Sequence, residues 1–127
     1  MSSTAQELVD CAEAMARSAT SESEYRAVCS RAYYGAFHAA NAFHNGLPAP
    51  GSVGKATGRH EQLIAQLANP GCGKSNKKYF VSQALSKGLR LLVDNRVKAD
   101  YHIDAEVNRG HAQASAAGAL VIAAKSI

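Results

Sequence analysis

Arg96 and His102, in the last third of the chain, are an arginine and a histidine with five residues between them. A guanidinium held by its helix can bind a phosphate through two donors and neutralise charge that develops in a phosphoryl transition state. An imidazole that titrates near neutral pH can accept the proton of a ribose 2′-hydroxyl or protonate a leaving 5′-oxygen. The pair is sufficient in principle for RNA cleavage without a metal ion, although this spacing also occurs by chance.

Basic side chains gather in the same part of the sequence. Residues 55–98 carry nine lysines and arginines against two acids, whereas residues 1–50 carry three bases and five acids. Such a stripe attracts phosphates and makes their binding sensitive to salt, which suits a nucleic acid or a nucleotide. A solvated helix face is the alternative explanation. The candidate substrate-binding residues within the stripe are Lys74, Lys77, Lys78 and Lys98.

A second polar group, formed by Arg31, Tyr34 and His38, recurs every three or four residues and so forms one ridge of a helix. The ridge suits internal hydrogen bonding or a subunit contact, with a direct catalytic role as the alternative. The histidines lack the spacing of metal ligands on a helix, since His38 and His44 are six residues apart. Three cysteines without a CxxC motif predict neither a zinc site nor a disulfide framework, and we expect no metal and no cofactor.

Two segments resemble motifs of nucleotide hydrolases. ANPGCGKS, from Ala68 to Ser75, fits a relaxed phosphate loop, and LLVD, ending at Asp94, is an apolar run that ends in an acid. A phosphate loop needs a preceding strand so that its backbone N–H groups converge on the phosphate, and the sequence predicts a helix there. We therefore interpret the first segment as a turn between helices, with Ser75 capping the next helix.

The segments that must position these groups have apolar residues at helical spacing. Capping signals at Thr4 and Ser21 predict a first helix over about residues 5–18 and a second that ends near Asn45. Glycine and proline over about residues 45–58 predict a flexible loop.

Three further helices are predicted after this loop. A short one buries Leu63, Ile64 and Leu67, a longer one runs to about Ala99, and Asp104 caps the last. The last helix carries a stripe of mostly small residues suited to close approach of another helix, formed by Val107, His111, Ala114, Gly118, Val121 and Ala124. No strand pattern or repeat is found, so the fold class is all-α, a helical bundle forming one domain over residues 1–127.

Composition limits what this bundle can bury. Of the 127 residues, 25 are alanine and only 24 are Leu, Ile, Val or Phe, so the core is thin in large side chains. With a net charge of only +4, we expect closely packed helices that gain from a partner rather than a disordered chain. No run approaches the ~20 apolar residues of a membrane span, and residues 1–19 lack a signal-peptide pattern. We therefore expect a soluble, cytoplasmic protein with no membrane contact.

Three parts of the chain, in order, resemble the HEPN domain (higher eukaryotes and prokaryotes nucleotide-binding). They are SRAYYGAFHA from Ser30 to Ala39, His60 after the glycine-rich loop, and the stretch from Leu89 to the ADYH that ends at His102. The resemblance covers about residues 5–125 and implies an up-and-down bundle of four or five helices, commonly a homodimer. Many members are ribonucleases of toxin–antitoxin, phage-defence or RNA-processing systems, with arginine–histidine motifs of two subunits facing each other. Many prokaryotic members pair with a small nucleotidyltransferase-like partner.

By position, the resemblance implies that Arg96 orients the scissile phosphate and that His102 acts as general base or acid. Asp100 and Tyr101 within the motif, and the ridge on the second helix, would support them. Two hypotheses remain open, because a shared fold does not establish an activity. One is a metal-independent endoribonuclease acting as a homodimer. The other is a non-catalytic HEPN module that binds a nucleotide, RNA or a nucleotidyltransferase-like partner protein; a phosphate-loop hydrolase is largely set aside.

Overall fold

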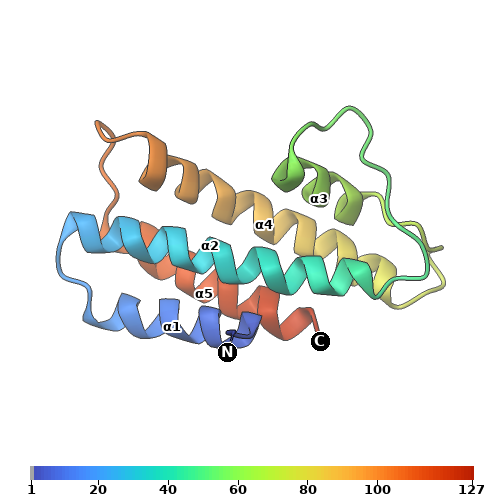
Figure 1. Ribbon diagram of the computed structural model, residues 1–127, viewed down its shortest axis with the longest axis horizontal. Helices are drawn as coiled ribbons and strands as arrows, with labels where there is room; N and C mark the ends of the chain where they lie inside the picture. Colours follow the sequence, from blue (N-terminus) through green and yellow to red (C-terminus); the bar gives the residue numbers. More distant parts are fainter. Residues whose placement is uncertain (1) are drawn as a thin grey trace.

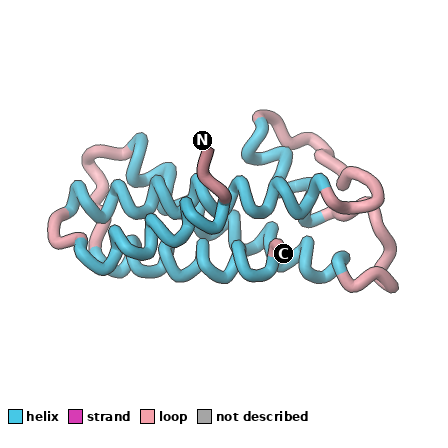
Figure 2. Tube along the Cα trace, turned by 60° about the horizontal axis from the view of Figure 1, so that its bottom comes forward, coloured by secondary structure: helices cyan, strands magenta, loops and turns pink. Residues whose placement is uncertain are grey.

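Five helices make up the fold in a computed structural model that describes residues 2–127. They are α1 (Ala5–Ser18), α2 (Glu22–Asn45), α3 (Arg59–Ala68), α4 (Lys78–Tyr101) and α5 (Arg109–Lys125) (Figure 1). Between residues 2 and 127 there is no strand (Figure 2). The all-α prediction is therefore confirmed, as is the bundle of four to five helices.

The four long helices alternate in direction along the chain, and the shorter α3 lies over α4 at one side of the bundle (Figure 1). α2 contacts every other helix, whereas α3 packs mainly on α4 and only slightly on α2. The main core runs through the middle of the bundle and receives side chains from all five helices, and its largest fully buried side chains include Tyr33, Leu67, Leu85, Leu89 and Ile122. The arrangement places one face of α2 beside the start of α3 and the second half of α4.

The first two helices begin where their local sequence signals predict. The Thr4 hydroxyl accepts the backbone N–H of Glu7, whose carboxylate accepts the N–H of Thr4, and this capping box starts α1. Ser21 accepts the N–H of Glu24 at the start of α2. α2 ends at Asn45 with Gly46 as its C-cap, again as predicted.

The last two helices begin later than the sequence indicates, which corrects two predicted caps. Ser75 does not cap α4, because the helix begins at Lys78, whose N–H is accepted by the Asn76 side chain at 2.9 Å. Asp104 does not cap α5, which begins at Arg109 with Asn108 as its N-cap. His111, expected on the packing stripe, instead completes the capping box by accepting the N–H of Asn108 at 3.0 Å.

The face by which α5 packs also differs from the predicted stripe. Its buried residues are Ala112, Ser115, Ala116, Ala119, Ile122 and Ala123. Of the predicted stripe, Ala114, Val121 and Ala124 are exposed. The helix is so rich in alanine that its apolar periodicity does not distinguish one face from the next.

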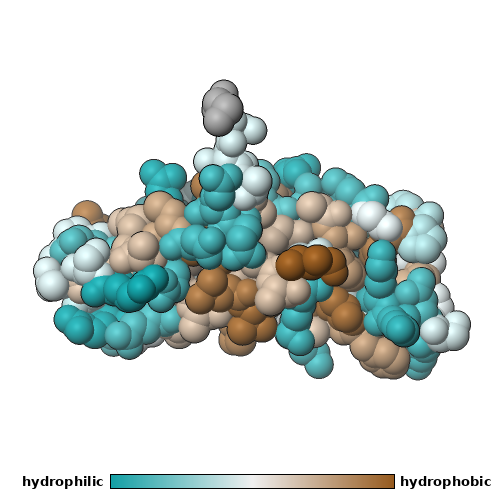
Figure 3. Space-filling view, turned by 90° about the horizontal axis from the view of Figure 1, so that it is seen from below, coloured by the Kyte–Doolittle hydropathy of each residue, from teal (hydrophilic) through white to brown (hydrophobic). Residues whose placement is uncertain are grey.

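The face of the bundle where α1 and α5 lie has hydrophilic ends and apolar side chains between them (Figure 3).

Close approach of helices does occur, between α1 and α2. A Cβ built on Gly35 of α2 would lie 2.8 Å from the Val9 Cγ2 atom of α1, so only glycine fits at this crossing.

None of the helices within residues 2–127 is both long enough and apolar enough to cross a membrane.

Candidate functional site

Arg96 is fixed in place by three neighbours on α2 and α4. Its Nε donates to the Asp100 carboxylate at 2.9 Å, one turn further along α4. Its guanidinium carbon lies 5.8 Å from the ring centre of Tyr33 and 5.3 Å from that of Tyr101. The Ser30 hydroxyl also donates to Asp100, at 3.4 Å. About a quarter of the Arg96 side chain is exposed, so the guanidinium is fixed in place and still accessible to a ligand.

His60, at the start of α3, lies next to this arginine and is held by aromatic side chains of α2. Its Nδ1 is 2.8 Å from the Tyr33 hydroxyl, and its ring centre is 4.5 Å from that of Phe37. Burial lowers the pKa of His60, and the charges of Arg96 and Arg59 lower it further, so the neutral imidazole is favoured at neutral pH. Burial raises the pKa of Tyr33 to about 12, so Tyr33 keeps its proton. When that phenol donates to Nδ1, the imidazole proton sits on Nε2.

Two open cavities meet at Arg96 and His60. The α3–α4 cavity, of about 410 Å³, is lined by His60, Glu61, Arg90, Val93, Asp94, Arg96, Val97, Lys98 and His102. The α2–α3 cavity, of about 360 Å³, is lined by Ser30, Tyr33, Tyr34, Phe37, His38, Arg59, His60 and Arg96. Both volumes lie at the small end of the roughly 300–1,000 Å³ of ligand sites. The arrangement can therefore present one guanidinium to ligands on either side of α3.

The structure brings together only part of the predicted site. Arg96, Lys98 and His102 line the α3–α4 cavity. The three lysines Lys74, Lys77 and Lys78 lie before or at the start of α4. Lys78 and Arg96 are eighteen residues apart on α4, which corresponds to ~27 Å along the helix axis. These lysines are therefore remote from the arginine–histidine pair.

The predicted ridge on α2 divides in a similar way. Tyr34 and His38 line the α2–α3 cavity, with their ring centres 4.6 Å apart in an edge-to-face arrangement. Arg31 is exposed and is not among the residues lining either cavity.

The position of His102 depends on Arg26, which sequence reasoning missed. Its guanidinium donates to the backbone carbonyls that end α4 and begin the next loop, those of Lys98, Ala99, His102, Ile103 and Ala105. The Nε of Arg26 is paired with Glu22, which also accepts the N–H of Val107 at 2.9 Å. The hydrogen bond from Arg26 holds the pKa of Glu22 below its usual value. The start of α2 thus fastens the loop that carries His102.

Acidic side chains moderate the positive charge of the α3–α4 cavity. Glu61 accepts a hydrogen bond from Arg90 at 2.9 Å across the cavity wall between α3 and α4. Asp94 lines the same cavity. The basic stripe of the sequence is therefore partly neutralised in this cavity. Of its members, Arg96 and Lys98 lie nearest His102 in sequence.

The segments that resemble hydrolase motifs lie in other surroundings. Helix α3 precedes the glycines of residues 71–73, and Asp94 lies within α4. Gly71 packs tightly against the 46–58 loop, because a Cβ there would lie 2.6 Å from the Pro50 carbonyl oxygen. Gly51 of that loop donates its N–H to the His44 Nε2 at 3.1 Å. Within residues 2–127, no three His, Cys, Asp or Glu side chains come together as metal ligands.

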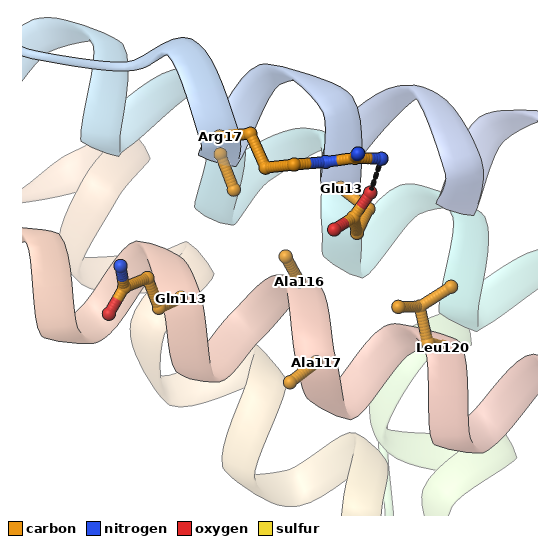
Figure 4. A pocket seen from close by; sticks show the side chains of 7 residues that line it. Glu13, Arg17, Gln113, Ala116, Ala117 and Leu120 are labelled. Carbon is orange, nitrogen blue, oxygen red and sulfur yellow. Dashed lines mark hydrogen bonds and ion pairs between the residues drawn. The ribbon is translucent and has the colours of Figure 1, made fainter.

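Further cavities lie beside α5. The groove between α4 and α5, of about 520 Å³, is mostly apolar, with Leu91 and Val121 exposed on its walls. The hollow between α1 and α5, of about 240 Å³, is smaller (Figure 4). In that hollow, the Arg17 side chain runs along α1 to an ion pair with Glu13 and faces alanines and Leu120 of α5 (Figure 4). Neither cavity combines tyrosine or phenylalanine rings with two arginines as the α2–α3 cavity does.

Comparison of the chain with known protein families, with characterised proteins and with solved structures finds no match.

Proposed function

We propose that the protein is a HEPN-type RNA-binding bundle that cleaves RNA as a homodimer, without a metal ion, using Arg96 and His102. The observation that carries the proposal is that both residues line one open cavity, where the arginine is held by Asp100 of α4 and Tyr33 of α2. The HEPN resemblance supports the same conclusion, as does Lys98, a member of the basic stripe that lines this cavity. The toxin–antitoxin or phage-defence setting and a nucleotidyltransferase-like partner belong to the proposal through that resemblance alone.

In the proposed reaction the ribose 2′-oxygen attacks the adjacent phosphorus while His102 accepts the 2′-hydroxyl proton. The bond from phosphorus to the 5′-oxygen breaks, and His102 of the partner subunit protonates the leaving oxygen. Arg96 donates to the non-bridging phosphate oxygens, where negative charge builds up in the transition state. The products are a 2′,3′-cyclic phosphate and a 5′-hydroxyl.

Exposed apolar side chains beside His102 support a dimer. Tyr101 is 66% exposed and Ile103 is 93% exposed, on either side of the histidine in sequence. Burying such side chains is favourable by about 1.5–3 kcal/mol each when they pass fully out of water. A second copy that covered them would bring the two histidines to one interface.

The experiment is cleavage of an end-labelled single-stranded RNA by purified protein in EDTA. We expect cyclic-phosphate products, their loss in His102→Ala, and an unchanged melting temperature in that variant. Lys98→Ala should lower the slope of log affinity against log salt by about 0.7, as for one phosphate contact on a single strand, and Lys125→Ala on α5 is its control. Cleavage that survives His102→Ala, or that needs magnesium, would contradict the assigned roles.

One observation favours the non-catalytic alternative. The Nε of Arg96 is already paired with Asp100, and its guanidinium packs on two tyrosine rings, as in an arginine that stabilises a fold. A module of this kind would bind RNA in a gel shift with the same salt dependence and would leave the RNA intact. The cleavage assay therefore separates the two functions.

A further inference from the structure

The α2–α3 cavity contains groups that the proposed cleavage does not use. Tyr34, Phe37 and His38 of α2 form aromatic walls, and Arg59 at the start of α3 adds a second guanidinium to that of Arg96. The guanidinium carbon of Arg59 lies 5.3 Å from the ring centre of Phe37. The cavity therefore offers flat apolar surfaces and two positive charges within one small volume.

Part of this aromatic cluster is core and part is open to a ligand. Tyr33 and Phe37 are almost fully buried, so packing alone accounts for them. Tyr34 is 49% exposed, and its hydroxyl makes no hydrogen bond within residues 2–127. Arg59 is exposed and, in the same part of the chain, forms no ion pair. Arg59 and Tyr34 pack on the rings of Phe37 and His38, but the Arg59 guanidinium has no acidic partner and the Tyr34 hydroxyl no hydrogen bond in this part of the chain, so their polar groups are available to a ligand.

The chemistry of these walls matches an unpaired nucleotide. Bases of single-stranded RNA are bound by stacking on aromatic side chains and on arginine planes, and their phosphates by guanidinium groups. The charged groups that line the cavity are the guanidinium groups of Arg59 and Arg96, and both are donors. Donors favour ligands rich in acceptors, such as phosphate oxygens and the carbonyl and ring-nitrogen edges of bases.

We propose that the α2–α3 cavity binds one unpaired nucleotide, with its base against Tyr34 and His38 and its phosphate between Arg59 and Arg96. Because Arg96 also lines the α3–α4 cavity, the bound nucleotide is the neighbour of the scissile phosphate, and this last placement rests on the proposed function. The cavity then selects single-stranded RNA, since a base inside a duplex cannot enter it.

The first experiment titrates the full-length protein with adenosine 5′-monophosphate, adenosine and inorganic phosphate by calorimetry. We expect the monophosphate to bind more tightly than either part. Tyr34→Ala should weaken the monophosphate about tenfold, as loss of one stacked base predicts, and leave phosphate binding unchanged. Arg59→Met should weaken the monophosphate and phosphate but spare adenosine.

Phe80→Ala, another exposed aromatic on the first turn of α4, is the control for Tyr34→Ala. Arg17→Met on α1 is the control for Arg59→Met. Monophosphate binding no tighter than that of phosphate, or equal affinities of Tyr34→Ala and Phe80→Ala, would overturn the proposal.

The RNA assay separates failure of this inference from failure of the proposed function. If Tyr34-dependent nucleotide binding is found but RNA stays intact, the cavity stands and the nuclease proposal fails. If RNA is cleaved with dependence on His102 while Tyr34→Ala leaves both KM and nucleotide affinity unchanged, only the cavity proposal fails. If both proposals hold, Tyr34→Ala should raise the KM for RNA about tenfold with little change in kcat.

Discussion

Replacement of Arg26 by methionine tests whether the start of α2 fixes the end of α4. The substitution keeps most of the aliphatic stem but removes the guanidinium that donates to the five carbonyls between Lys98 and Ala105. It also leaves Glu22 without the guanidinium that it pairs with. The last turn of α4 and the following loop then lose their shared anchor.

The size of the effect follows from which of these bonds are shielded from water. Those to the carbonyls of Lys98, Ala99 and Ala105 are partly buried, whereas those to His102 and Ile103 are exposed. Water replaces the exposed bonds at little cost, and each shielded bond contributes about 1 kcal/mol. The free energy of unfolding should fall by about 3 kcal/mol. For a chain of this length that lowers the melting temperature by roughly 10 °C.

Arg17→Met is the matched control, because Arg17 forms the same kind of ion pair with the glutamate four residues before it, Glu13 (Figure 4). Arg17 is 73% exposed and lies on α1, which does not contact α4, so its loss should cost no more than about 0.5 kcal/mol. Thermal and urea denaturation of the two variants measure the difference. Equal, small shifts in both would refute the capping role of Arg26.

Two more predictions concern stability. Gly35→Ala should destabilise the fold by about 1–3 kcal/mol in urea denaturation, because the added methyl meets Val9, while Gly73→Ala, with no close neighbour, should not. Burial lowers the pKa of His44, so the unfolded chain binds its proton more readily, and stability should fall as pH drops below about 6.5. His44→Gln should flatten that slope in melting curves; an unchanged slope would show that the proton binds elsewhere.

Sequence reasoning worked for the starts of α1 and α2, which are decided within one turn of helix. The caps at Thr4 and Ser21 depend on residues three positions away, and both form as predicted. The cap predicted at Ser75 fails because the neighbouring Asn76 accepts the N–H of Lys78 instead. The cap predicted at Asp104 fails because contacts from elsewhere compete. Residues 102–107 are held out of helix by the N-terminal turns of α2, through Arg26 and Glu22. No sequence pattern near residue 104 indicates that contact.

The same distinction applies to the candidate site. The spacing of Arg96 and His102 is a local feature, and the structure does place both on one cavity. The hydrogen bond between Tyr33 and His60 joins residues 27 positions apart, on helices that barely touch, and no sequence period connects them. The sequence nevertheless contained a signal. Tyr33 and Phe37 lie one turn apart on α2 and form an aromatic surface that another element has to cover. The sequence did not show from which direction α3 would pack on this surface.

Arg96 and His102 differ in what their mutation can reveal. Arg96 joins α2 to α4 through Asp100 and Tyr33, so its replacement disturbs packing as well as any bound phosphate. The hydrogen bonds of His102 within residues 2–127 are all made by its backbone, so its imidazole can be removed without disturbing the fold. Loss of cleavage in Arg96→Ala is therefore expected from a structural as well as from a catalytic arginine. Loss of cleavage in His102→Ala at an unchanged melting temperature can come only from the chemistry or from the interface, and measurement of the oligomeric state then separates those two causes.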